Sequence, residues 1–190
     1  MRRFRFAMGT STDFYIRLAT PADALTVADL HTRSWQTAYR GIMSDAYLDQ
    51  IAPTERREVW SRKLSADTPA ERAVLLAEYE GCAQGFICVV ADQDRRWGSF
   101  IDNLHMVPDR HGRGGGRQLL EAAAAWLIAR GALRPVYLWV LEPNAGARAF
   151  YRRMGAVEAE TGLRDTPEGL KVPGFRCVWD SPQALVAPVS

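Results

Sequence analysis

The sequence has no long apolar run and few cysteines. No segment approaches the ~20 apolar residues of a membrane span, or the apolar stretch of roughly 7–15 residues of a secretory signal. The cysteines number 3 and never form C-x-x-C, which argues against a disulfide framework or a zinc site. Cys82, Cys88 and Cys177 are therefore expected to be reduced, buried thiols. We expect a cytoplasmic protein with no metal and no membrane contact.

An excess of charge of one sign is also absent from the sequence. The formal charge is +2, and there is no run of five or six like charges. This excludes the strong electrostatic attraction by which most nucleic-acid-binding proteins hold phosphates, so no nucleic-acid partner is expected. Hydrophobic residues, by contrast, make up 47% of the 190 residues, enough for the core of one domain. We predict a single domain over 14–181, between a flexible leader (1–13) and a flexible tail (182–190).

Apolar periodicity and turn residues predict the secondary structure. Seven segments have the character of β-strands: 15–18, 73–78, 85–90, 99–107, 136–141, 157–163 and 175–179. Five segments are predicted to be helical: 21–41, 45–50, 53–64, 115–130 and 144–154. An antiparallel meander followed by β-α-β predicts an α/β (α+β) fold, in which a mixed, mostly antiparallel sheet of about seven strands is flanked by helices.

A glycine-rich turn links the strand that ends near Pro108 to the helix that starts at Gly115. The turn reads His111, Gly112, Arg113, Gly114, Gly115, Gly116 and Arg117. Unpaired amides at a helix N-terminus, together with the helix dipole, favour an anion, and glycine lets phosphate approach the backbone. A dinucleotide fingerprint would need glycine at position 117, and a Walker loop would need a Gly-Lys-Ser/Thr ending. The turn therefore predicts a phosphate site that belongs to neither class.

A second motif lies where the strand 136–141 passes into the next helix. Asn144 is a suitable N-cap for that helix. Ala147 and Tyr151 are four residues apart on one face, which Asn144 shares. Phe150 is expected in the core, and taken alone Tyr151 would be assigned there as well.

The two motifs, "NLHMVPDRHGRGGGRQLL" and "LWVLEPNAGARAFYRRMGA", resemble those of the GNAT superfamily of N-acetyltransferases. That family has a strand, an (Arg/Gln)-x-x-Gly-x-(Gly/Ala) turn and a helix, then a strand, an asparagine and a Phe-Tyr helix. His111 stands where the family usually has arginine or glutamine. The opening "HTRSWQTAYRGIMSDAYLDQI" is also similar to a helical opening in that family. The likeness is strongest over 102–155 and implies a GNAT-like sheet with one splayed strand pair.

The resemblance implies acetyl-CoA as cosubstrate. Its pantetheine arm would pair with the backbone of Leu104, His105, Met106 and Val107 as an added strand. Its pyrophosphate would lie on the turn formed by His111, Gly112, Arg113, Gly114, Gly115, Gly116 and Arg117. The second motif would complete the cofactor site with Asn144, Ala147, Phe150 and Tyr151.

The transfer needs a proton donor for the departing thiolate and a base for the attacking amine. The resemblance assigns the donor role to Tyr151. A lysine-like amine has a pKa of about 10.4, so a base is useful at neutral pH, and Asp102, His105 and Glu142 are candidates nearby in the sequence. Glu142 is equally well explained as a solvated carboxylate. A histidine in the position of His105 is more often a partly buried residue whose hydrogen bonds are made within the protein. Strand alternation puts Asp102 and His105 on opposite faces unless a bulge intervenes.

The acceptor is the least determined part of the prediction. His31, Trp35 and Tyr39 recur every four residues on the first helix, either as core or as an aromatic wall beside the amine. We expect a small-molecule or peptide amine as acceptor. The alternative is a non-catalytic module that binds or senses acyl-CoA, and a nucleotide- or RNA-binding domain is disfavoured. A homodimer is compatible with the sequence.

Overall fold

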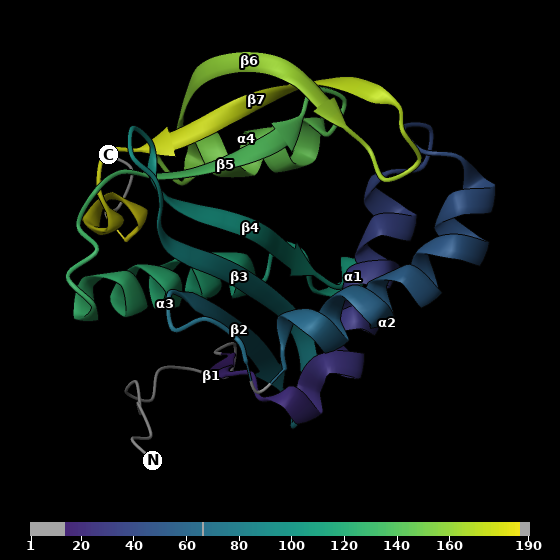
Figure 1. Ribbon diagram of the computed structural model, residues 1–190, viewed down its shortest axis with the longest axis horizontal. Helices are drawn as coiled ribbons and strands as arrows, with labels where there is room; N and C mark the ends of the chain where they lie inside the picture. Colours follow the sequence, from purple (N-terminus) through teal and green to yellow (C-terminus); the bar gives the residue numbers. More distant parts are fainter. Residues whose placement is uncertain (1–13, 66, 187–190) are drawn as a thin grey trace.

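One seven-stranded mixed sheet organises the molecule, as predicted (Figure 1). The computed structural model describes residues 14–65 and 67–186. The predicted leader (1–13) and the last four residues of the predicted tail (187–190) lie outside the described residues. The strands are β1 (Tyr15–Leu18), β2 (Arg72–Tyr79), β3 (Cys82–Asp94), β4 (Gly98–Met106), β5 (Val136–Leu141), β6 (Val157–Asp165) and β7 (Lys171–Trp179), in the spatial order β1-β2-β3-β4-β5-β7-β6.

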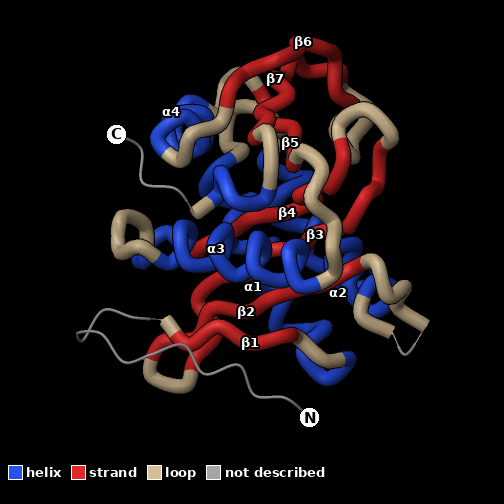
Figure 2. Tube along the Cα trace, turned by 90° about the vertical axis from the view of Figure 1, so that its left-hand side faces the viewer, coloured by secondary structure: helices blue, strands red, loops and turns tan. Residues whose placement is uncertain are grey.

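Helices cover both faces of the sheet (Figures 1 and 2). The longer ones are α1 (Ala24–Ala38), α2 (Ala52–Lys63), α3 (Gly115–Ala129) and α4 (Ala145–Arg153). Short turns of other helix types are η1 (Pro21–Asp23), η2 (Tyr47–Ile51), η3 (Pro108–Arg110) and η4 (Pro182–Leu185). In the described ranges no helix is both long and apolar enough to cross a bilayer.

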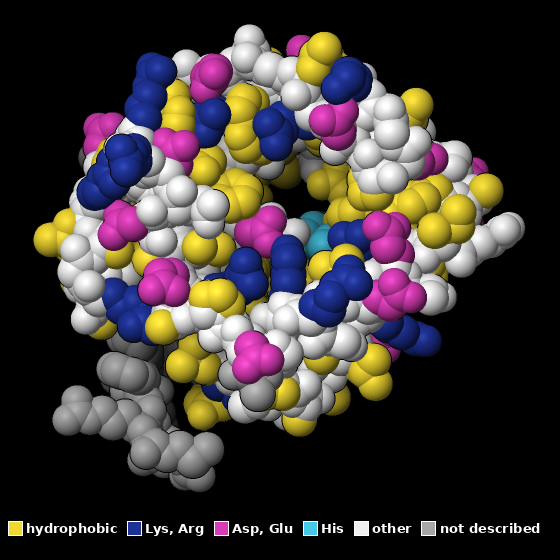
Figure 3. Space-filling view, in the orientation of Figure 1, with side chains coloured by type: hydrophobic (Ala, Val, Ile, Leu, Met, Phe, Trp, Pro, Cys, Tyr) yellow, Lys and Arg dark blue, Asp and Glu magenta, His cyan; other side chains and the backbone are white. Residues whose placement is uncertain are grey.

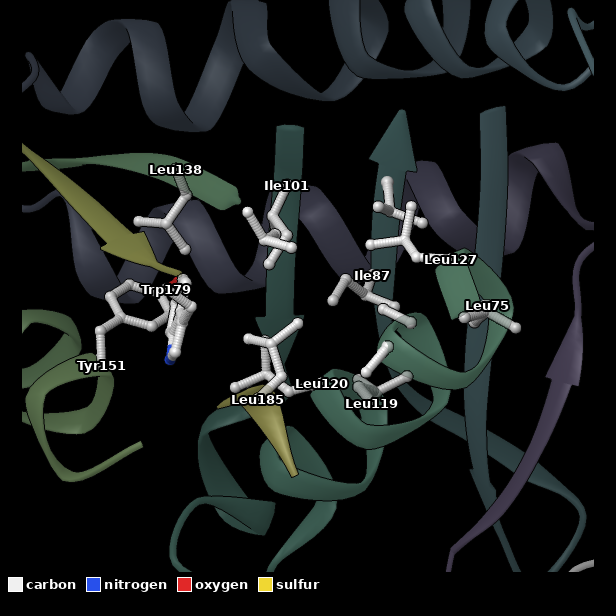
Figure 4. Packing of buried hydrophobic residues seen from close by; sticks show 14 of the residues in the cluster. Leu75, Ile87, Ile101, Leu119, Leu120, Leu127, Leu138, Tyr151, Trp179 and Leu185 are labelled. Carbon is white, nitrogen blue, oxygen red and sulfur yellow. The ribbon is translucent and has the colours of Figure 1, made fainter. Parts of the chain in front are cut away.

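Two apolar clusters lie on opposite faces of the first four strands. The larger cluster joins α3 to the sheet, with Leu119, Leu120 and Leu127 packed against residues such as Ile87 (Figure 4). The smaller cluster lies under α1 and α2 and includes the fully buried Trp60. Each face of these strands is therefore covered by helices, which agrees with their nearly continuous apolar sequences.

The structure corrects three of the predicted boundaries. The first helix begins with a 3-10 turn and ends at Ala38, three residues before Gly41, which has a φ of +77°. The β3–β4 hairpin is longer than predicted, because the strands extend to Asp94 and from Gly98. Residues 182–185, predicted to be part of a flexible tail, form η4, and its Leu185 is completely buried against α3.

The strands β4 and β5 are parallel, but they pair only at one end. Their register contains two residue pairs, Ser99 with Val136 and Phe100 with Tyr137. Beyond Phe100 the two strands separate, although β4 still pairs with β3 and β5 with β7. The sheet therefore contains the predicted splay.

Arginines stacked on aromatic rings occupy part of the sheet around β5 and β7. The Arg176 guanidinium lies 4.5 Å from the ring centre of Trp139, 4.6 Å from that of Trp97 and 4.9 Å from that of Tyr137. Arg164 lies over the same Trp139 ring at 4.5 Å. Such cation–π contacts cover flat aromatic surface with long side chains, and the Arg176 charge is also paired with Glu160 at 2.8 Å.

Candidate functional site

The splay between β4 and β5 holds a cavity of about 730 Å³. Figure 3 shows the molecule hollowed there, with a histidine visible at the edge of the hollow. The lining comes from the glycine-rich turn, from β4 and β5, from the length of α4 and from the end of α1. One continuous space therefore joins the predicted phosphate site to the predicted acceptor site.

Backbone conformation explains two of the glycines in the turn. Gly112 has a φ of +74°, and Gly114, the N-cap of α3, has a φ of +85°. Residues with a Cβ atom rarely adopt such positive values. The first helical bond runs from the Gln118 N–H to the Gly114 carbonyl at 3.0 Å. The amides before Gln118 therefore need acceptors from outside the helix, as an anion site requires.

Close packing explains the third glycine. A Cβ on Gly115 would lie 2.5 Å from Cε of Met106 and 2.9 Å from a ring carbon of Phe14. A Cβ on the fourth glycine, Gly116, would lie 3.2 Å from the Phe150 ring. The start of α3 thus lies directly against the end of β4, which brings the turn to the mouth of the splay.

The side chains of the turn differ in their access to the cavity. His111 and Arg117 line it, but Arg113 is exposed and does not. The His111 Nε2 lies 3.1 Å from the Met106 carbonyl, so this ring connects the turn to the end of β4. Arg117 donates a 2.7 Å hydrogen bond to Glu121 one helical turn away. The exposed amides of the turn, rather than its arginines, are therefore the groups best placed to accept an anion.

A β-bulge in β4 resolves the predicted conflict between Asp102 and His105. Cys88 pairs with Asn103 and Val89 with Ile101, so Asp102 is the extra residue of the bulge. Asp102 forms an ion pair with Lys63 of α2, and His105 contacts α1. Both side chains therefore lie on the face covered by α1 and α2, where simple alternation would have separated them.

At the C-terminal end of β4, one residue predicted to bind the cofactor lies outside the cavity. Leu104, His105 and Met106 line the cavity, but Val107 is buried outside it. Its N–H donates a 2.8 Å hydrogen bond to the Gln84 carbonyl and is not free to pair with a ligand. The available strand edge thus ends one residue earlier than predicted.

Residues of the second motif form another wall of the cavity. The Asn144 side chain accepts a 3.2 Å hydrogen bond from the Ala147 N–H and caps α4, as predicted. Asn144, Ala147, Phe150 and Tyr151 all line the cavity. Burial and, to a smaller extent, the nearby Tyr39 raise the pKa of Tyr151 above its usual value. Its phenol therefore stays protonated at neutral pH.

Besides Val107 and Arg113, two more of the predicted site residues lie outside the lining. Glu142 is exposed just after β5 and does not reach the cavity. His31 is buried behind the cavity wall, where its Nδ1 accepts a 2.9 Å hydrogen bond from the Trp60 indole. Burial holds the pKa of His31 well below its usual value. For His31 the core interpretation of the α1 stripe is the correct one.

Trp35 and Tyr39, the other two members of that stripe, do line the cavity. The Arg56 guanidinium covers the Trp35 ring at 4.5 Å, and the Trp35 and Tyr39 rings meet edge to face at 5.6 Å. Trp139 of β5 also lines the cavity, although it was not among the predicted site residues. Aromatic rings from two elements, α1 and β5, therefore form part of the cavity wall.

His105 belongs to a buried polar group that the sequence did not reveal. Its Nδ1 lies 2.9 Å from the Ser34 hydroxyl, and its ring centre lies 4.5 Å from that of His31. Desolvation by the surrounding side chains lowers the pKa of His105 to about 4. The ring is therefore neutral at physiological pH. Ser34 is 71 residues away in the chain, which is why no local pattern could pair it with His105.

Comparisons with known proteins agree with this geometry. Residues 28–156 match the model of the acetyltransferase (GNAT) family. The uncharacterised N-acetyltransferase YuaI of Bacillus subtilis is 27% identical over 133 residues, which cover 68% of this chain and 72% of YuaI.

Solved structures share the fold. The PaiA N-acetyltransferase of Thermoplasma acidophilum, in complex with coenzyme A, superposes with a TM-score of 0.68 at 19% identity, over 88% of this chain and 99% of that one. The yncA structure of Salmonella typhimurium, with its cofactor acetyl-CoA, gives a TM-score of 0.62 at 15% identity over 94% and 96% of the two chains.

Proposed function

Because this chain belongs to the acetyltransferase (GNAT) family, we propose that it transfers the acetyl group of acetyl-CoA directly to a primary amine of a small molecule or a peptide. The observation that carries the proposal is the single cavity that runs from the glycine-rich turn through the β4–β5 splay to Trp35 and Tyr39. A direct transfer requires that both substrates reach one reaction centre, and this cavity has two differently built ends.

The end at the glycine-rich turn suits coenzyme A. The positive φ angles of Gly112 and Gly114 and the free amides at the start of α3 favour a diphosphate. The edge of β4 from Leu104 to Met106 faces the splay, where an amide-containing arm can pair with it as a strand. Two proteins of the same fold were solved with coenzyme A and with acetyl-CoA, which supports this assignment.

The reaction then follows from ordinary acyl-transfer chemistry. The amine nitrogen attacks the thioester carbonyl carbon, the C–N bond forms and the carbonyl oxygen becomes an oxyanion. Backbone N–H groups along β4 are suited to stabilise that oxyanion. The intermediate collapses with cleavage of the C–S bond. Tyr151 donates a hydrogen bond, and finally its proton, to the departing sulfur; a thiol's pKa is about 8.5, so only a weak acid is needed.

The test is a ligand series followed by an activity assay. Thermal unfolding is measured with acetyl-CoA, CoA, NAD and ATP, and we expect the CoA species alone to raise the midpoint. Release of free thiol from acetyl-CoA is then followed with a panel of primary amines and matched alcohols. Thiol release with an amine, together with an acetylated nitrogen found by mass spectrometry, supports the proposal.

The two measurements separate the alternatives. Stabilisation by CoA without thiol release from any acceptor would favour a module that binds acyl-CoA without turnover. Transfer to alcohols alone would retain an acetyltransferase and overturn the amine as acceptor. Equal stabilisation by all four ligands, or by none, would contradict the assignment of the turn.

A further inference from the structure

The two carboxylates nearest the motifs are poorly placed to accept a proton from the amine. Asp102 lines the cavity, but it is already in an ion pair with Lys63. Glu142 is exposed to solvent and lies outside the lining. A general base must come within hydrogen-bonding distance of the proton that it accepts, so another group on the cavity wall is needed.

His105 meets this requirement by position. Its side chain lines the cavity from β4, as does Trp35 from α1, and its backbone belongs to the strand edge, Leu104 to Met106, that would bind the pantetheine arm. Its ring is held from three sides: Phe86 at 5.4 Å and His31 at 4.5 Å between ring centres, and the Ser34 hydroxyl at 2.9 Å from Nδ1. These contacts leave the other ring nitrogen, Nε2, without a hydrogen-bond partner among the described residues.

We infer that His105 is the general base of the reaction and that Ser34 is its positioning residue. This inference rests on the proposed amine acetylation. When Nδ1–H donates its hydrogen bond to the Ser34 hydroxyl, the lone pair of the imidazole is at Nε2, the nitrogen that can face an incoming amine. Ser34 thereby fixes the orientation of the ring, and its hydroxyl can accept the Nδ1–H bond that the Nε2-basic tautomer requires.

Each proton that moves in the reaction has a donor and an acceptor. The amine attacks in its neutral form, and its N–H becomes acidic as the C–N bond forms. His105 Nε2 takes that proton and becomes an imidazolium, while Tyr151 gives its proton to the thiolate. The imidazolium then releases its proton to solvent, and the phenolate takes one up, which restores both groups. No oxidant, reductant or metal enters this sequence.

The groups around His105 act on its charge in opposite directions. Desolvation lowers its pKa most, the Asp102 carboxylate of β4 raises it, and the Arg56 guanidinium of α2 lowers it. The neighbouring His31 is neutral because burial lowers its pKa, and its Nδ1 accepts a hydrogen bond from the Trp60 indole. His105 is thus in its basic form throughout the neutral range, and the Asp102 carboxylate favours the imidazolium formed during transfer.

The experiment compares His105→Ala and Ser34→Ala with the wild-type enzyme, using acetyl-CoA and the best amine from the panel. We expect His105→Ala to lower kcat by about 100-fold or more, in the range of general-base catalysis, with an unchanged affinity for CoA. Added imidazole should restore part of kcat. Pyrazole, a ring of the same size and much weaker basicity, should not. His105→Gln, which retains polar packing, covers the case in which His105→Ala does not fold.

Ser34→Ala should lower kcat by roughly 10-fold, equivalent to about 1.4 kcal/mol, with little change in KM for acetyl-CoA. Ser34→Thr keeps the hydroxyl and should recover most of that loss, which a purely structural role would not predict. Thr32→Ala, on the same helix, is the matched control: its hydroxyl bonds to the Ala28 carbonyl, and Thr32 does not line the cavity.

Wild-type kcat for His105→Gln, or equal rescue of His105→Ala by imidazole and pyrazole, would overturn the inference while leaving the acetyltransferase proposal intact. Failure of the wild-type protein to acetylate any amine would instead overturn the proposed function on which the inference rests. The two failures are therefore distinguishable in one series of assays.

Discussion

At the residue scale, Tyr151 illustrates how one side chain can satisfy both packing and chemistry. Its ring contacts Phe150 and Trp179 edge to face, with ring centres 5.3 and 6.1 Å apart. The structure records no hydrogen bond to its hydroxyl from the described residues, so packing alone does not require a tyrosine rather than a phenylalanine. A hydroxyl on a cavity wall without a partner is consistent with the role of proton donor.

Tyr151→Phe tests this role. The ring and its packing are retained, so the free energy of unfolding should change by less than about 1 kcal/mol. The loss of the acid should lower kcat by roughly 100-fold or more. Affinity for CoA, measured by calorimetry, should stay within about twofold of the wild-type value. An unchanged kcat would contradict the acid role.

Gly114 allows a test of the anion site in which charge is isolated from backbone strain. Its φ of +85° disfavours most side chains, but asparagine and aspartate tolerate this region and have the same shape. A Cβ here would have open space, with only the Gln118 amide at 3.9 Å. We expect Gly114→Asp to bind CoA at least 10-fold more weakly than Gly114→Asn, by calorimetry at low salt. Equal affinities would count against a diphosphate at this turn.

At the scale of elements, short irregular segments shape the site more than the long helices do. The bulge at Asp102 moves its carboxylate to the face of α1 and α2, and the left-handed glycine at the start of α3 turns the helix amides toward the splay. The 3-10 turn η4 places Leu185 against α3 and adds it to the larger apolar cluster. Each of these is one turn or one residue long.

Leu185→Ala measures what η4 contributes. Removal of a completely buried leucine side chain should lower the free energy of unfolding by about 2–5 kcal/mol. The adjacent Val186 is 39% exposed, and Val186→Ala should cost less than about 1 kcal/mol. Chemical denaturation of both variants gives the comparison. Equal, small losses would show that the segment contributes little to the fold.

At the scale of the whole molecule, the sheet consists of two halves that meet at β4 and β5 through two residue pairs. The cavity lies where the halves separate, and it is lined from both of them. A ligand in the cavity therefore touches α3 on one half and α4 on the other, so its binding should stabilise the halves relative to each other.

Hydrogen exchange with and without CoA tests this coupling. At about 100 times Kd, CoA should add about 2.7 kcal/mol to the stability. Exchange should slow at the first turn of α3, over 112–118, and also at the start of α4, over 145–148. ATP at the same concentration is the control and should slow neither segment. Protection confined to α3 would mean that the second motif does not contact the ligand.

The sequence by itself determined the elements and both motifs. Strand alternation, helical periodicity and glycine at helix ends depend on local geometry, so the seven strands, the glycine-rich turn before α3 and the Asn144 cap were all predictable. The resemblance to the GNAT family added the splay, which the structure contains. These features need only residues that are neighbours in the chain.

Only the tertiary structure decided which side chains face the cavity. The bulge at Asp102 reverses the alternation along β4, and packing against Trp60 removes His31 from the site. Ser34 reaches His105 across 71 residues, and Glu142 points to solvent although it adjoins the second motif. Orientation of a side chain depends on partners that are distant in sequence, and those distances exist only once the chain has folded.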